Sequence, residues 1–143
     1  MIEIEYKCGN GVTIKSNQAK MSIDPNLSAI GLKNLKTTGD IELSTEDRFS
    51  VKDQDSLVLI NGPGEYGVAD FDVAGFSALR HIDGEGDEKL STIYRIEVGS
   101  EARIGLLGNV AAKISDEQYE RIGVVDILII PVGGNGYTLD AKD

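Results

Sequence analysis

The stretch "VDILIIPVGGNGYTLDAKD", residues 125–143, decides the class of fold. Its first part, residues 125–132, is almost entirely apolar, which is typical of a strand that is covered on both faces. A glycine-rich turn follows, and Thr138 then offers an N-cap for a second helix. Upstream, Ser115 and Gln118 have the spacing of a capping box. The pattern therefore predicts a helix, a strand, a turn and a helix in succession, which is an α/β arrangement.

The sequence before the capping box has a different periodicity. Apolar and polar residues alternate there with a period of two, as in half-buried strands, and "CGNG" joins two such runs into a β-hairpin over residues 2–16. No repeat or linker divides the chain, so we predict one β-rich α/β domain over residues 1–143. The expected strands are residues 2–7, 12–16, 20–24, 40–44, 56–60, 71–82, 91–98 and 101–108.

Charge and cysteine content limit the classes of partner. The formal net charge is −10, from 24 acidic and 14 basic residues, and an acidic protein is repelled by nucleic acid and by anionic membranes. No apolar run is long enough to span a bilayer, and the N-terminus lacks the pattern of a signal peptide. Cys8 is the single cysteine and cannot form an intrachain disulfide. We therefore expect a cytoplasmic protein with no nucleic-acid and no membrane partner.

Four segments resemble one family of enzymes. They are "TIKSNQAKMSIDPNL" (13–27), "LINGPGEYGV" (59–68), "STIYRIEVGSEARIGLLGNV" (91–110) and "ISDEQYERIGVVDILIIPVGGNGYTLDAKD" (114–143). Together they are similar to a small bacterial branch of the metallo-β-lactamase-fold hydrolases. The resemblance implies an αββα sandwich of two similar lobes, with a two-metal site between the sheets. Family members continue past the final corner to a further metal-binding histidine. We therefore expect mainly the N-terminal lobe, either as a fragment or as a chain that completes its fold by association.

The resemblance also implies where metal ligands should lie. The family's His-x-His-x-Asp-His motif would follow the strand at 40–44, its bridging aspartate would fall in "LLGNV", and a His–Asp pair would fall near "RHID". A catalytic zinc needs three protein ligands, mostly imidazole or thiolate, and this chain has one histidine and one cysteine in total. We therefore predict no metal and no cofactor. The candidate site positions are Thr45, Asp47 and Ser50 in the histidine motif, His81, and Asn109 at the bridging position.

Two of these assignments leave alternatives open. Glu46, Asp47 and Asp53 could hold magnesium or calcium weakly, since hard cations prefer oxygen ligands, or they could form a solvated acidic loop. His81 could be a surviving ligand or a general base, or simply a histidine at a strand end.

The glycine-rich corner is a candidate ligand loop. Backbone N–H groups between a strand and a helix can hold an anion, although the glycine spacing matches neither a phosphate loop nor a dinucleotide fingerprint. The alternative is that Thr138 only caps a helix. The candidate anion-binding residues are Gly133, Gly134, Asn135, Gly136 and Thr138.

These observations favour a hydrolase-like scaffold without catalysis. We predict a non-catalytic binding or assembly module that has lost the ligand histidines, and whether it is an enzyme stays open. The alternative is a metal-dependent hydrolase with an atypical zinc or manganese site around His81, Glu46, Asp47 and Asn109. Residues 126–132 should leave an open apolar edge, so we expect a homo-oligomer, with a small anion as the expected ligand.

Overall fold

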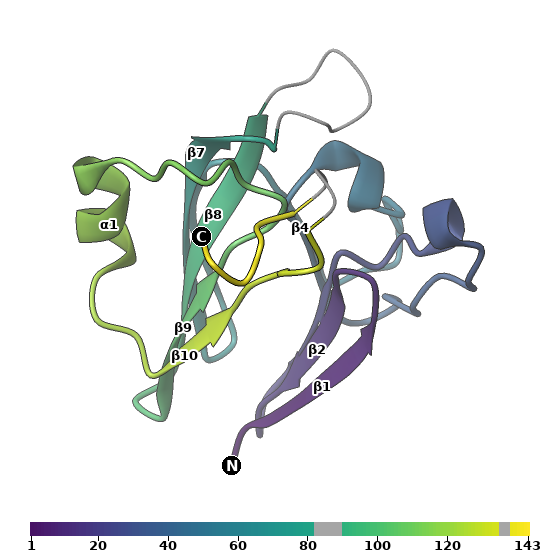
Figure 1. Ribbon diagram of the computed structural model, residues 1–143. Helices are drawn as coiled ribbons and strands as arrows, with labels where there is room; N and C mark the ends of the chain where they lie inside the picture. The colour runs from purple at the N-terminus through teal and green to yellow at the C-terminus, as the bar shows by residue number, and fades with distance from the viewer. Residues whose placement is uncertain (82–89, 135–137) are drawn as a thin grey trace.

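The computed structural model describes residues 1–81, 90–134 and 138–143. It shows two five-stranded sheets that pack against each other, with one α-helix on an outer side (Figure 1). The N-terminal sheet has the order β1-β2-β3-β4-β5, and the C-terminal sheet has the order β10-β9-β8-β7-β6. The N-terminal sheet consists of β1 (Glu3–Cys8), β2 (Gly11–Lys15), β3 (Lys20–Ile23), β4 (Ile41–Ser44) and β5 (Val58–Asn61). The C-terminal sheet consists of β6 (Gly64–Val68), β7 (Phe71–Leu79), β8 (Leu90–Val98), β9 (Ala102–Leu106) and β10 (Ile127–Ile129).

The N-terminal sheet changes from antiparallel to parallel pairing along its width. The pairs β1–β2 and β2–β3 are antiparallel, whereas β3–β4 and β4–β5 are parallel. Parallel neighbours need a crossover, which is usually an α-helix. Here each of the two crossovers contains only a short 3-10 helix, η1 (Ser28–Ile30) in one and η2 (Asp47–Phe49) in the other. Loops therefore cover the outer face of this sheet where the resemblance implies a helical layer.

A buried glutamate anchors the second of these loops. Glu42 of β4 is fully buried, and one of its carboxylate oxygens accepts the Ser50 hydroxyl at 2.6 Å. The same carboxylate accepts the backbone N–H groups of Val51 and Lys52 at 3.2 Å and of Asp53 at 3.1 Å. Since a buried carboxylate is costly unless its oxygens are satisfied, this set of bonds explains how glutamate can occupy a central strand.

The C-terminal sheet is a three-hairpin meander followed by one parallel strand. β6 to β9 pair antiparallel in sequence, and β10 then joins β9 in parallel. The helix α1 (Asp116–Ile122) forms the crossover between β9 and β10 and packs on the outer face of this sheet (Figure 1). The capping box at Ser115 and the stop at Gly123 are confirmed, with Gln118 N–H donating to Ser115 Oγ and Gly123 at φ 63°. No helix among the described residues has the length and hydrophobicity to cross a bilayer.

Strand alternation divides the buried residues between two cores. In β7, Phe71 and Val73 face the N-terminal sheet, whereas Phe76 and Ala78 belong to the cluster beneath α1. The inter-sheet core is completely buried at most of its positions, so its burial is the main favourable term in folding. Its fully buried members are Ile14, Met21, Ile23, Ile41, Leu43, Ile60, Tyr94, Ile96 and Ile104.

Tyr94 of β8 connects the two sheets. Its hydroxyl donates to the Ser44 carbonyl at 2.8 Å and accepts the Gly62 N–H at 2.9 Å, at the point where the chain crosses between sheets. Its ring lies over Gly75, where an added Cβ would come within 2.7 Å of the ring. Glycine is required at that position because any side chain would displace the tyrosine ring.

Two expectations for the C-terminal stretch are wrong. The strand expected over residues 125–132 shortens to β10, and it is not covered on both faces, since Leu128 is 51% exposed. β10 pairs with β9 on one side and has no described strand on the other. Thr138 does not cap a helix; its hydroxyl accepts the Gly134 N–H at 2.7 Å and closes the turn. The apolar composition of residues 125–132 indicated a strand, but it could not show whether neighbouring elements would cover that strand.

Candidate functional site

The ends of β4 and β9 meet at Thr45, which is almost fully buried. The Thr45 N–H and hydroxyl donate to the two carboxylate oxygens of Asp24, both at 2.7 Å. The Thr45 carbonyl accepts the Thr92 N–H at 2.9 Å and the Ser91 hydroxyl at 3.3 Å. On the opposite side, a Cβ at Gly108 would lie 2.7 Å from Thr45 Cβ and Oγ1. The sheets are therefore in close contact at this position.

Asp24 is the most perturbed carboxyl group near the site. It follows β3 with φ 46°, and only 2% of its surface is exposed. Burial raises the pKa of Asp24 from 3.8 to about 7, against the lowering effect of the two bonds from Thr45. Desolvation disfavours the charged form of a carboxyl group, so near neutral pH Asp24 lies close to the midpoint between its two forms.

Beside Thr45, a second buried acid is neutralised by arginines. Glu46 and Arg80 are 5% and 7% exposed, and Arg80 Nη1 lies 3.1 Å from Glu46 Oε1. Arg48 Nε lies 3.2 Å from the same oxygen, and the Arg48 guanidinium lies over the Phe49 ring. A buried charge needs such a partner, and here the cation beside the site is a guanidinium of the chain itself.

Asn109 and His81 lie together, in the segments that follow β9 and β7. The His81 N–H donates to the Asn109 carbonyl at 2.8 Å, and Asn109 Oδ1 accepts the Asn10 amide at 2.9 Å. His81 is half-buried, and its Nδ1 is buried without a hydrogen-bond partner among the described residues. Asn109 follows Gly108 directly, so Thr45, His81 and Asn109 are brought to one end of the sandwich.

The other two candidate positions take part in different interactions. Ser50 donates to Glu42 on the outer face of the N-terminal sheet. Asp47 is exposed, and a hydrogen bond from Asn61 together with Lys52 lowers the pKa of its carboxyl. Asp53, the third acid of the suggested cation loop, accepts bonds from Asp55 N–H and two threonines, which lower its pKa. No three His, Cys, Asp or Glu side chains of the described residues gather in a metal-binding group.

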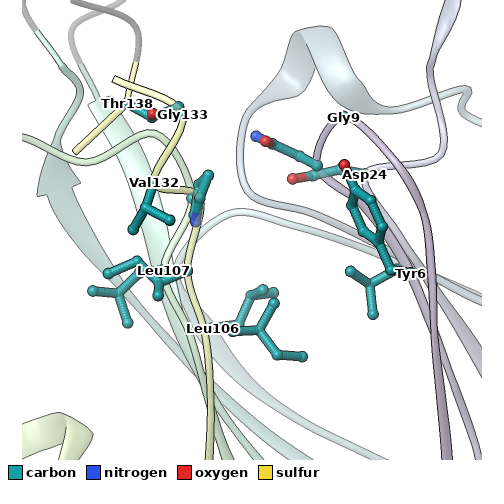
Figure 2. Close-up of a pocket in the computed structure, with 14 residues that line it drawn as sticks. Tyr6, Gly9, Asp24, Leu106, Leu107, Val132, Gly133 and Thr138 are labelled. Carbon is teal, nitrogen blue, oxygen red and sulfur yellow. The ribbon is translucent and has the colours of Figure 1, made fainter. Parts of the chain in front are cut away.

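A cavity of about 480 Å³ lies next to Asp24, between the β1–β2 hairpin and the segment after β10. Figure 2 shows Tyr6 and Asp24 on one side of it, and Leu106, Leu107 and Val132 on the other. Most of its wall is apolar. The lining residues are Tyr6, Gly9, Asn10, Val12, Asp24, Leu106, Leu107, Gly108, Ile129, Ile130, Pro131, Val132, Gly133 and Thr138.

The glycine-rich corner forms one rim of this cavity. Gly133 and Thr138 line it, while Asn135 and Gly136 lie outside the described residues. The Gly134 N–H is already donated to Thr138, and the Asp140 carboxylate lies so close to Gly134 that an added Cβ there would meet it. The Gly134 N–H is therefore not free to bind an anion, and the nearby Asp140 carboxylate would repel one, so both features disfavour anion binding at this corner.

Comparison with known proteins identifies the family. The profile of the β-lactamase superfamily domain matches residues 3–143. The chain belongs to the metallo-β-lactamase superfamily. A crystal structure from Thermotoga maritima, assigned as a Zn-dependent hydrolase of this superfamily, has a TM-score of 0.72 and 20% sequence identity. The match covers 99% of this chain and 66% of that one, so this chain spans a little under two thirds of its length. A comparison with curated proteins gives no match.

The zinc implied by the superfamily does not fit the residues at this site. Thr45 offers a neutral hydroxyl whose proton is donated to Asp24, and Asn109 supplies a neutral amide oxygen that accepts from Asn10. Zinc sites use imidazole, thiolate or carboxylate ligands, and His81 is the sole imidazole of the sequence. Sequence reasoning missed Asp24 and Arg80, because their roles depend on partners from distant segments.

Proposed function

We propose that this superfamily member is a non-catalytic binding module that has kept the hydrolase scaffold. The observation that carries the proposal is the internal use of the site's polar groups. Thr45, at a ligand-histidine position, is held by Asp24, and Glu46 next to it is neutralised by Arg80 and Arg48. A metal centre needs donor atoms directed into open space, whereas these side chains bond to one another.

Metal analysis tests this proposal directly. Purified protein should carry far less than one zinc or manganese per chain, and adding either metal after chelator treatment should leave the thermal unfolding midpoint unchanged. Activity on activated ester and phosphodiester substrates should stay at the rate of the buffer, with and without metal. Stoichiometric metal that is lost in His81→Ala would overturn the proposal, since no other residue could supply the imidazole.

One observation favours a second candidate, a metal-dependent hydrolase with an atypical site. The buried Nδ1 of His81 has no partner among the described residues, and a buried polar atom without a partner calls for an explanation. A metal ion held by His81 would supply one. The same metal analysis separates the two candidates, because only the hydrolase requires metal at His81.

Assembly is a further part of the proposal. Leu128 and Val132 are about half exposed, at 51% and 52%, on and just after the edge strand β10. An apolar edge strand offers unpaired backbone groups to another chain, and an exposed apolar patch often marks an interface. We therefore propose a homo-oligomer that forms through β10.

A further inference from the structure

We propose that the cavity between the β1–β2 hairpin and the segment after β10 binds a small apolar amine, with the ammonium group held by Asp24. This inference deepens the binding role proposed above and rests on it. The cavity, of about 480 Å³, falls within the range of small-molecule sites. Such sites combine mostly apolar walls with a few polar groups that fix the ligand's orientation.

The charge of the lining selects the class of ligand. Among the described residues that line the cavity, Asp24 is the one carboxylic acid, and none is a lysine, arginine or histidine. The whole chain carries a net charge of −10, so the field around the cavity favours cations. A carboxylate or phosphate ligand would meet no compensating cation and would face the acid of Asp24. The cavity therefore disfavours the anion that the glycine-rich corner suggested.

Asp24 has acceptor capacity left for such a ligand. A carboxylate offers about four lone-pair positions, and the two bonds from Thr45 use one position on each oxygen. The remaining positions belong to a desolvated group, and an ammonium donor is the partner that compensates a buried carboxylate best. Among the cavity's polar side chains, Asn10 already donates its amide to Asn109. Asp24 is thus the strongest orienting group in the wall.

Apolar side chains on both sheets would hold the ligand body. Val12 comes from the N-terminal sheet, and Leu106 and Ile129 come from the C-terminal sheet. Val132 lies at the more exposed part of the wall. An amine on a short alkyl or phenylalkyl chain matches this arrangement, with the charged end at Asp24 and the hydrocarbon between the sheets.

Calorimetric titration of metal-free protein with three matched probes tests the inference. The probes are 2-phenylethylamine, its neutral alcohol analogue and the carboxylate analogue, at slightly alkaline pH so that Asp24 is ionised. A charge-assisted bond is worth about 1 to 2 kcal/mol more than a neutral one, so the amine should bind about tenfold more tightly than the alcohol. The carboxylate should bind most weakly. Equal affinities, a preference for the carboxylate, or no binding at all would overturn the inference.

Three variants locate the site. Asp24→Asn should lower amine affinity about tenfold and change alcohol affinity far less, since it removes the charge and keeps one oxygen acceptor. If Asp24→Asn does not fold, Val132→Trp decides the matter. It should fill the mouth of the cavity and abolish binding, while Val124→Trp, at an exposed valine that does not line the cavity, should bind like the wild type. Unchanged binding in Val132→Trp would refute the location.

Different measurements would contradict the non-catalytic role and the amine ligand. Metal binding would remove the non-catalytic role without changing the amine titration of metal-free protein. Absence of amine binding, with no metal bound, would remove only the ligand assignment.

Discussion

Replacing Asp24 by asparagine should change how stability depends on pH. Burial raises the pKa of Asp24 from 3.8 to about 7, so the folded state holds this proton over a range where the unfolded chain has lost it. Stability is therefore fully present below the unfolded pKa and is lost as pH rises through the folded pKa. Each tenfold change in protonation is about 1.4 kcal/mol, so the whole effect is about 4 kcal/mol.

The same linkage gives the change in the free energy of unfolding between two pH values that can be compared by experiment. Between about pH 5 and about pH 8, the Asp24 contribution to the free energy of unfolding should fall by about 2 to 3 kcal/mol. Asparagine does not titrate, so the difference between wild type and Asp24→Asn isolates this group from all other acids. The loss of the carboxylate's bonds to Thr45 adds a constant to that difference.

Urea unfolding of both proteins at the two pH values measures the effect. Wild type should lose about 2 to 3 kcal/mol relative to Asp24→Asn on going to the higher pH. Asp55→Asn, at an exposed position, is the matched control and should follow the wild type at both values. A difference between wild type and Asp24→Asn that does not change with pH would refute the reasoning, and a difference that grows in favour of the wild type would reverse its sign.

Three further changes test the packing and the edge of the fold. Glu42→Ala removes the acceptor of three backbone N–H groups and should lower the free energy of unfolding by about 3 to 5 kcal/mol in a chemical denaturation experiment; a loss within experimental error would mean that the loop does not depend on the carboxylate. Gly108→Ala places a methyl group 2.7 Å from Thr45 and should lower the free energy of unfolding by about 1 to 3 kcal/mol. Its control is Gly133→Ala, whose methyl group would lie 3.5 Å from Thr138 Oγ1 and should leave the free energy of unfolding nearly unchanged in the same assay. Leu128→Lys should convert the expected oligomer to monomer in light scattering while Leu57→Lys, at another exposed leucine, leaves it unchanged; a wild-type monomer at high concentration would contradict assembly through β10.

Periodicity and capping predicted much of the fold. Sequence patterns located the strands that form β1 to β5 and β7 to β9, and the Ser115 capping box located α1. No strand was expected over β6 (Gly64–Val68), so that strand was missed. These features depend on residues close together in sequence, so a short window contains their cause. The length and burial of β10 were overestimated. An apolar run indicates that a strand can be buried, but it does not show which neighbouring elements are present to bury it.

The site was harder to predict, because its properties depend on distant partners. The family resemblance named Thr45, His81 and Asn109 as site positions together with Asp47 and Ser50. The structure brings the first three to one end of the sandwich, whereas the other two make different interactions. The buried state of Asp24 depends on Thr45, which is 21 residues away. Glu46 and Arg80 are 34 residues apart, so neither ion pair nor pKa could be read from a local pattern.

The tyrosine that joins the two sheets also sets an alkaline limit for the protein. Burial is the main cause that raises the pKa of Tyr94 above that of a free phenol. The hydroxyl that bridges Ser44 and Gly62 must therefore keep its proton for as long as the sandwich stays closed. As pH rises above the ordinary phenol range, ionisation of this side chain in the unfolded chain should therefore lower the stability of the closed sandwich. Because the chain has five tyrosines, the phenolate absorbance that is missing in Tyr94→Phe would isolate the signal of this side chain.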